Sequence, residues 1–280
     1  MFSYLSKRCN YPVYTNTKVQ YYKSGEEMYP DMLEDLKKAQ KYIFFEFFII
    51  DEGEFWNSIL DVMVEKVKEG VDVRVIYDDM GTIQKLPFKY HKKLEKLGIP
   101  TVVFNRFRVG ATSLSTTNNR DHRKICVIDG HTAFTGGINL ADEYINCVNR
   151  FGYWKDSAVL LKGKAAYCFA LAFLELWNLY KNTDNDYSIF RPKQTELEES
   201  VRNVLQYQKG SGFVQPYVDS PLDEELTGEQ VYLNIINQST KYLYITTPYL
   251  IIDNELVTAL CLAAKRNVDV RIITPFIPDK

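Results

Sequence analysis

A histidine and a lysine lie two positions apart at the start of a stretch that otherwise resembles a buried β-strand. In "HRKICVID" the polar side chains of His122 and Lys124 come directly before and among apolar residues. Burying an unpaired charge is costly, so a core strand gains nothing from this pair. The two side chains therefore face either water or a negatively charged group.

The residues around this pair predict its orientation. The pair Asp129 and Gly130 follows the apolar run and is a strong signal for a β-hairpin turn. Side chains alternate along a strand, so His122, Lys124 and Cys126 are expected on one face. The residues between them, including the apolar residues 125 and 127, are expected on the other. Asp129 falls in the turn, where this alternation does not assign it a face.

The returning strand adds groups that suit a phosphate. Gly136 and Gly137 allow the backbone to approach a ligand closely, and the side-chain amide of Asn139 is a hydrogen-bond donor. Together with an imidazole and an ammonium, these groups predict a site for a phosphoryl group. Its candidate residues are His122, Lys124, Asp129, Gly136, Gly137 and Asn139.

Composition limits the other functions of the chain. Its 280 residues carry 34 basic and 36 acidic side chains, a formal charge of −2, so no nucleic-acid partner is expected. Five scattered cysteines show no metal or disulfide spacing and indicate a reducing compartment. The most apolar stretches, 42–50 and 165–180, are shorter than the roughly 20 residues of a membrane span. We predict a core strand and a buried helix for them, and no transmembrane segment in the chain as given.

The chain repeats itself. "KYIFFEFFIID" from Lys41 is similar to "KYLYITTPYLIID" from Lys241, and "VDVRVIY" from Val71 recurs as "VDVRIIT" from Val268, both about 200 residues later. Each copy has the pattern helix, strand, helix, strand, which predicts an α/β fold with a mixed or mostly parallel sheet flanked by helices.

The repeat also predicts the domain organisation. We expect a first unit with the motif over 1–180, a linker over 181–212 and an incomplete second unit over 213–280. A second copy of the motif would lie near residue 320, roughly forty residues past Lys280. The 280 residues are therefore expected to hold one complete unit and the start of another, with the second motif in a missing C-terminal half.

The motif has a known counterpart. The pattern H-x-K-x4-D followed by G-G-x-N resembles the signature of the phospholipase D superfamily. Stretches such as "EFFIIDEG", "GVDVRVIYD" and "GGINLADEY" are similar to bacterial cardiolipin synthases in particular, and "YWKDSAVLLKG" takes the place of their W-x-D strand. These enzymes join two phosphatidylglycerol molecules and release glycerol.

The resemblance implies a mechanism and partners. It makes His122 the nucleophile of a phosphatidyl-histidine intermediate, with the histidine of a second motif protonating the departing glycerol. Lys124 and Asn139 would neutralise the phosphoryl oxygens, and Asp129 or another carboxylate would orient the imidazole. No metal or other cofactor is implied. The expected partners are phosphatidylglycerol and a membrane surface, so the resemblance implies a membrane-associated protein.

Other polar residues have two interpretations each. Glu46, inside an apolar strand, is implied by the resemblance to support the active centre, but a structural ion pair explains it as well. Asp156 is at most a supporting residue, and His91 and His131 are expected at the surface. A lysine cluster predicts a solvated helix face or a contact with anionic lipid; its members are Lys85, Lys89, Lys92, Lys93 and Lys96.

Two further functions compete with the phosphatidyltransferase. One is a phosphodiesterase or nuclease that carries one motif per chain and completes its site by dimerisation. The start of a second unit after residue 213 favours the two-motif enzyme over this alternative. The other is a non-catalytic fragment that folds but lacks the second histidine, and it predicts little activity for the 280 residues alone.

Overall fold

The computed structural model describes residues 1–106, 119–202, 212–219 and 225–276, and it divides into two compact units. The larger unit is Tyr14–Pro216, and the smaller one combines Met1–Val13 with Tyr217–Lys280. The sequence did not predict that the first 13 residues group with the C-terminal part. Among the described residues, no helix has the length and hydrophobicity needed to cross a bilayer.

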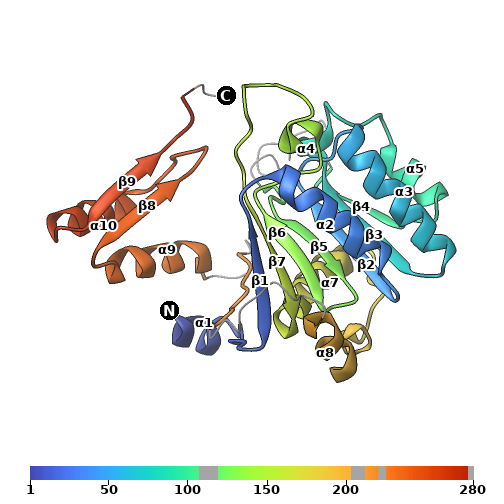
Figure 1. The fold of residues 1–280 in the computed structure, drawn as a ribbon, viewed down its shortest axis with the longest axis horizontal. Coiled ribbons are helices and arrows are strands. Elements are labelled where there is room, and N and C mark those ends of the chain that lie inside the picture. Colours follow the sequence, from blue (N-terminus) through green and yellow to red (C-terminus); the bar gives the residue numbers. More distant parts are fainter. Residues whose placement is uncertain (107–118, 203–211, 220–224, 277–280) are drawn as a thin grey trace. The chain divides into compact units, whose positions relative to one another are not determined.

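The larger unit is built on a seven-stranded sheet with the order β1-β7-β6-β5-β2-β3-β4 (Figure 1). Its strands are β1 (Thr17–Tyr22), β2 (Tyr42–Phe47), β3 (Asp72–Asp78), β4 (Thr101–Phe104), β5 (Lys124–Ile128), β6 (Thr132–Gly136) and β7 (Ala158–Gly163). The predicted mixed α/β fold is confirmed. Parallel pairing joins β2, β3 and β4, whereas β1, β7, β6, β5 and β2 pair antiparallel. Four of the six strand pairs are therefore antiparallel, and one of them, β5 with β6, is a hairpin of consecutive strands.

Helices cover both faces of this sheet, with α2 and α3 in front and α7 behind in Figure 1. The helices of the larger unit are α2 (Gly25–Lys37), α3 (Glu54–Lys68), α4 (Asp79–Thr82), α5 (Tyr90–Lys96), α7 (Tyr167–Tyr180) and α8 (Gln194–Arg202). Three short 3-10 helices accompany them: η1 (Asp142–Ile145), η2 (Lys164–Ala166) and η3 (Tyr187–Phe190). The two apolar stretches that the sequence placed in a core strand and a buried helix are β2 and α7.

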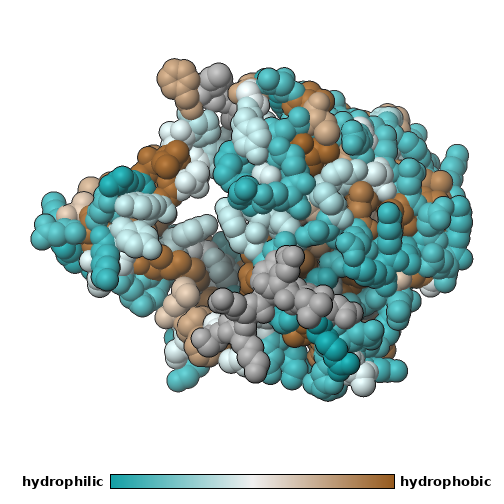
Figure 2. Space-filling model, in the orientation of Figure 1, coloured by the Kyte–Doolittle hydropathy of each residue, from teal (hydrophilic) through white to brown (hydrophobic). Residues whose placement is uncertain are grey.

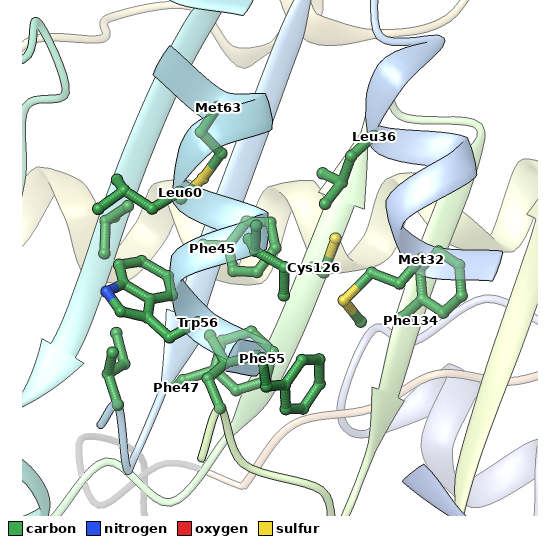
Figure 3. Packing of buried hydrophobic residues seen from close by; sticks show 14 of the residues in the cluster. Met32, Leu36, Phe45, Phe47, Phe55, Trp56, Leu60, Met63, Cys126 and Phe134 are labelled. Atoms are coloured by element: carbon green, nitrogen blue, oxygen red, sulfur yellow. The ribbon is translucent and has the colours of Figure 1, made fainter. Parts of the chain in front are cut away.

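The main core lies between α2, α3 and the front of the sheet (Figure 3). Both helices have apolar residues at three- and four-residue intervals, which gather on the face that packs on the sheet. Met32 and Leu36 come from α2, Met63 comes from α3, and Phe45 and Phe134 come from the sheet. The outer surface of the larger unit is mostly hydrophilic, with isolated hydrophobic residues, in the view of Figure 2.

The back of the sheet is covered by aromatic residues, and part of the predicted linker belongs to it. The ring of Phe44 stacks on Phe173 of α7 at 4.6 Å between ring centroids. The Arg74 guanidinium lies over the Phe44 ring and pairs with Asp184 at 2.6 Å. Phe190 packs on Phe44 as well, at 5.4 Å. Residues 181–202 were expected to form a surface linker, but these contacts make them part of the larger unit.

The predicted hairpin joins β5 to β6, and its turn has a second role. Asp129 and Gly130 both have positive φ, 51° and 71°, as a type I′ turn requires. The buried Asp129 carboxylate accepts hydrogen bonds from the backbone N–H groups of Gln40 (2.8 Å), Lys41 (2.8 Å) and Tyr42 (2.9 Å). The turn is therefore fastened to the start of β2.

The smaller unit repeats part of this design. In addition to α1 (Phe2–Lys7), this unit contains α9 (Thr227–Gln238), β8 (Tyr242–Thr246), α10 (Asn254–Lys265) and β9 (Asp269–Ile273). Strands β8 and β9 pair in parallel with Tyr242 opposite Asp269, as Tyr42 lies opposite Asp72 in the larger unit. The predicted order of helix, strand, helix and strand is thus present in both units.

Removing the Asp129 carboxylate is expected to destabilise the larger unit. We expect Asp129→Ala to cost about 3 kcal/mol, because partly or fully buried N–H groups lose a charged acceptor. Asp129→Asn keeps one oxygen and tolerates positive φ, so it should cost only about 1 kcal/mol. Urea unfolding followed by tryptophan fluorescence measures this, since Trp56, Trp154 and Trp177 all lie in the larger unit. An Ala variant as stable as the unmodified chain would contradict the expectation.

Candidate active site

Lys124 is the first residue of β5 and is almost completely buried. It lies directly opposite Phe47 on β2, on the same face of β5 as Cys126, as the alternation predicted. Its side chain borders a narrow apolar slot that is also lined by Met28, Met32, Phe134 and Gly136. Only 4% of the residue is exposed, so its ammonium group has few routes to solvent.

The surroundings of the Lys124 ammonium disfavour its charged form. Its Nζ donates a hydrogen bond to the backbone oxygen of His122 at 2.6 Å and lies 5.4 Å from the centre of the Phe48 ring. Burial lowers the pKa of Lys124 to about 8, although the carboxylates of Asp121, Asp156 and Asp78 act in the opposite direction. An anion bound beside this group would favour its protonated form.

His122 lies beside Lys124, just before the strand begins. Its side chain is exposed, and its ring centroid lies 4.8 Å from that of Phe48, with 50° between the ring planes. Phe48 therefore contacts the imidazole and also lies close to the ammonium. The structure brings the predicted pair together and adds Phe48, which the sequence analysis missed because it continues the apolar run of β2.

A buried carboxylate positions the segment that leads into His122. Asp78, at the end of β3, accepts hydrogen bonds from Arg120 Nε at 2.9 Å and from the backbone N–H of Asp121 at 3.0 Å. It also accepts one from the backbone N–H of Gly81 at 3.1 Å. Burial raises the pKa of Asp78, whereas these donors act against that rise. The carboxylate at the end of the parallel strand β3 thus fixes residues 120 and 121, which lead into His122.

Glu46 does not face Lys124. It lies opposite Ile125 in the β2–β5 pairing, so its side chain points to the other face of the sheet. There Arg123 Nε lies 2.5 Å from Glu46 Oε1, but the N–H of this nitrogen is directed at Asp121 Oδ1, 3.1 Å away. Glu46 thus lies beside Arg123 on the face away from Lys124, and any effect on the site must act through Asp121 and Arg123.

Glu46 and Asp121 form a pair of buried carboxyl groups. Within the described part of the chain, neither oxygen of Glu46 nor Asp121 Oδ2 has a hydrogen-bond partner. Burial and the negative charge of Asp121 raise the pKa of Glu46 well above its ordinary value, and the Arg123 charge only partly offsets them. A proton held by Glu46 would give this pair the donor that it lacks.

The two glycines permit contact between strands. A Cβ at Gly136 would overlap the backbone oxygen of Ser157, and one at Gly137 would overlap the carboxylate of Asp156. The N–H of Gly137 donates to Ser157 O at 3.0 Å. The close approach that the sequence predicted therefore exists, but the neighbour is the segment before β7. It places Asp156 near Lys124, whose charge acts against a rise in the Asp156 pKa that burial causes.

Two of the predicted site residues have structural partners in place of a ligand. Asn139 is buried; its Oδ1 accepts from the Ile49 N–H at 3.0 Å and its Nδ2 donates to the Tyr144 hydroxyl at 2.9 Å. It therefore braces the end of β2 and is not an exposed phosphate donor. Asp129 lies at the other end of β5 from Lys124, roughly 15 Å away along the strand. Its carboxylate binds backbone N–H groups, so it does not orient the imidazole.

The other two histidines lie away from this corner of the sheet. His91 is in α5, and His131 follows the hairpin turn, with Nδ1 2.9 Å from Thr132 Oγ1. Both are half-buried and not fully at the surface as predicted. Among the described residues, His122 is thus the histidine that lies beside Lys124, and Lys124 is the lysine that could neutralise a phosphoryl group.

Comparison with known proteins identifies the family of the chain. The family model described as "Cardiolipin synthase, PLD-like domain" matches residues 32–162 and 232–279, more than half of the chain. The chain belongs to this family. The matched ranges include the candidate active site in the larger unit and most of the repeat in the smaller one, in agreement with the resemblance to phospholipase D-like enzymes.

Relatives extend over nearly all of this cardiolipin synthase-like chain. A Streptococcus mutans protein described as uncharacterized is 50% identical over 278 residues, 99% of this chain and 57% of that protein. The cardiolipin synthase of Alkalihalophilus pseudofirmus is 34% identical over 269 residues, 96% of this chain and 51% of that enzyme. The cardiolipin synthase of Halalkalibacterium halodurans is 31% identical over 280 residues and is covered to 53%. The chain therefore spans about half the length of these relatives.

A solved structure shares the fold of this family member. The phosphatidylserine synthase of Haemophilus influenzae superposes with a TM-score of 0.64 and covers 91% of this chain, while this chain covers 61% of that enzyme. The sequences are 17% identical. The likeness supports the phospholipase D-like fold.

The pKa of Lys124 predicts how anion binding depends on pH. The ammonium is charged below about pH 8 and neutral above it, so the affinity for sulfate should fall by up to about tenfold for each further pH unit. Lys124→Arg should remove this fall, because a guanidinium stays charged. Sulfate titrations followed by NMR measure the effect. Lys162→Arg is the control, since Lys162 is a largely buried lysine paired with Asp35 at 2.7 Å; loss of the pH dependence there would contradict the assignment.

The raised pKa of Glu46 predicts a pH-dependent stability difference. A carboxyl group with a raised folded-state pKa stabilises the fold below its ordinary value of 4.5 and loses this contribution as the pH rises. Glu46→Gln mimics the protonated form, so its stability relative to the unmodified chain should increase from about pH 4.5 towards neutral pH. Urea unfolding of both proteins across this range tests it. The opposite trend would show that Glu46 is an ionised partner of Arg123.

Proposed function

We propose that this chain supplies the nucleophilic half of a phosphatidyltransferase site that converts two phosphatidylglycerol molecules to cardiolipin and glycerol. The observation that carries this proposal is the arrangement of His122 and Lys124 at the start of the central strand β5, both close to Phe48. Membership in the cardiolipin synthase family supports the choice of substrate. The exposed imidazole offers a nucleophile, and the buried ammonium offers a positive charge.

The proposed reaction has two steps. A ring nitrogen of His122 attacks the phosphorus of the first phosphatidylglycerol, and the bond from phosphorus to the glycerol oxygen breaks. A general acid protonates that oxygen, so that glycerol leaves and a phosphatidyl-histidine remains. The hydroxyl of a second phosphatidylglycerol then attacks the same phosphorus, loses its proton to the group that acted as acid, and restores the free imidazole. Cardiolipin is the product.

Lys124 acts on the charge that develops in both steps. As the phosphorus is attacked, negative charge builds on the phosphoryl oxygens, and a fixed ammonium in a site with little water stabilises it strongly. Because burial lowers the pKa of Lys124 to about 8, the negative charge of a bound substrate phosphate would shift the lysine towards its charged form. Asp156, next to Gly137, is one of the carboxylates whose charge acts on Lys124.

The general acid is proposed to come from a second motif. The 280 residues contain one H-x-K-x4-D pattern, at His122, Lys124 and Asp129. Relatives named cardiolipin synthase are about twice as long as the matched region. A second histidine outside these 280 residues would complete the site. The start of a second repeat in the smaller unit supports a two-motif enzyme over a dimer of single-motif chains.

Trapping the covalent intermediate tests the nucleophile. We expect a protein extended to the length of the relatives to retain a labelled phosphatidyl group on histidine when the reaction with labelled phosphatidylglycerol is quenched. His122→Ala should abolish this label, because no other imidazole lies beside Lys124 among the described residues. His131→Ala is the matched control and should keep it. Label found on another residue would show that the nucleophile is misassigned.

Comparing the 280-residue chain with the extended protein tests the need for a second motif. Loss of a general acid alone typically lowers a rate by about 10² to 10⁴, so the chain alone should form little or no cardiolipin. Product analysis by thin-layer chromatography measures this. Robust cardiolipin formation by the 280 residues would contradict the proposal. Cleavage of DNA without any lipid turnover by the extended protein would favour a nuclease.

A further inference from the structure

The segment between β3 and β4 carries an exposed aromatic residue at its tip. Phe88 is 89% exposed, and Ile83 in the same loop is 52% exposed. Lys89, the next residue, has a φ of 62°, and α5 begins directly after it. Its ammonium lies 4.8 Å from the centre of the Phe88 ring. We call residues 83–96, this loop together with α5, the Phe88 ridge.

The helix of the Phe88 ridge has one apolar and one cationic side. Tyr90 and Leu94 are buried, and the Tyr90 hydroxyl accepts a hydrogen bond from Trp56 Nε1 at 2.8 Å. The exposed residues are Lys92, Lys93, Glu95 and Lys96, with Lys89 directly before the helix, and Glu95 pairs with Lys181 at 3.8 Å. Glu52 pairs with Lys93 at 2.5 Å, but no salt bridge within the described part of the chain involves the other three lysines. The helix therefore presents uncompensated positive charge next to Phe88.

The Phe88 ridge follows β3 and α4 in the chain, and the end of β3 lies near the candidate active site. Strand β3 ends at Asp78, whose carboxylate holds the segment before His122, and α4 follows at once. Gly81 of α4 packs so closely on the Phe48 backbone oxygen that a Cβ there would overlap it. The short helix α4, directly before the ridge, thus contacts Phe48 and Asp78, which also contact the site.

A charge network fixes the base of the ridge. Lys85 pairs with Asp51 at 2.7 Å and with Glu143 at 3.3 Å, and Glu143 also pairs with Arg150 at 3.0 Å. Lys85 is therefore paired within the protein, unlike Lys89, Lys92 and Lys96, for which the described part of the chain shows no salt bridge. Arg150 belongs to a second loop with exposed apolar residues, in which its guanidinium lies 5.2 Å from the Phe151 ring centre. The network connects this loop to the ridge.

We propose that the Phe88 ridge docks the protein on a bilayer that contains anionic phospholipid. Phe88 inserts among the lipid headgroups, where an aromatic ring is favourable, and Lys89, Lys92 and Lys96 contact lipid phosphates. This inference rests on the proposed function, since a site that acts on a membrane lipid must reach the headgroup layer. A surface that bound polyanions through charge alone would have no use for an exposed phenylalanine at its tip.

Vesicle flotation with the 280-residue chain tests the proposal. Vesicles of phosphatidylcholine alone should bind weakly, and vesicles of equal parts phosphatidylcholine and phosphatidylglycerol should bind clearly. Phe88→Ser should lower binding about tenfold through the lost apolar burial. Lys92→Gln with Lys96→Gln should lower it about twenty-fivefold, since each lysine near an anionic surface contributes about a factor of five. Urea unfolding midpoints confirm that each variant is folded.

Matched controls separate docking from general effects. Tyr21 on β1 is 64% exposed, and Lys37 and Lys68 are exposed lysines on α2 and α3. Tyr21→Ser, and Lys37→Gln with Lys68→Gln, should change vesicle binding less than about twofold. If these controls reduce binding as much as the ridge variants, or if Phe88→Ser binds like the unmodified chain, the proposal is wrong. An oligonucleotide bound as tightly as the vesicles, without any effect of Phe88→Ser, would indicate a polyanion surface instead.

A spectroscopic variant makes insertion visible. Phe88→Trp should show a blue-shifted and more intense emission when vesicles with phosphatidylglycerol are added, whereas Tyr21→Trp should not. No shift for Phe88→Trp in a vesicle-bound protein would overturn the placement of the ridge. Failure of this test is distinguishable from failure of the proposed function, because trapping on His122 is carried out with detergent-dispersed lipid.

Discussion

The burial of the Lys124 ammonium is the constraint on which this site depends. The proposed reaction needs a positive charge at the phosphate, yet the strand that carries Lys124 belongs to an apolar sheet. The fall in the pKa of Lys124 from 10.5 to about 8 means that the site disfavours the charged form by roughly 3 kcal/mol relative to water. This is the net effect, in which the carboxylates of Asp121, Asp156 and Asp78 already offset part of the cost of burial, and a bound phosphate diester would offset more of it.

This balance holds only if β5 keeps its register. A shift by one residue would move Lys124 to the face of α7 and Ile125 to the apolar slot. The Asp129 carboxylate opposes such a shift, because it binds three N–H groups at the start of β2 while Lys124 lies opposite Phe47 at its end. The same pairing keeps Glu46 on the opposite face, where it cannot neutralise the lysine.

The sequence patterns correctly predicted the strand face on which Lys124 lies and the internal repeat. They did not predict the hydrogen-bond partners of the polar site residues. Alternation placed Lys124 with Cys126, and the Asp-Gly pair located the hairpin. The turn position of Asp129 was predicted correctly, but the role that the resemblance implied for it, beside the imidazole, is replaced by hydrogen bonds to backbone N–H groups at the start of β2. Asn139 is hydrogen-bonded to Ile49 and Tyr144, and residues 181–202 pack on the back of the sheet. Both features arise from tertiary contacts that local sequence patterns do not contain.

The central claim is that His122 and Lys124 together hold one phosphoryl group. A crystal structure of the chain soaked with tungstate, located by its anomalous scattering, tests this most directly. The account predicts an oxyanion within hydrogen-bonding distance of both the His122 ring and Lys124 Nζ. Tungstate that binds only elsewhere, for example in the basic hollow lined by Lys37, Lys38 and Lys66, would contradict it.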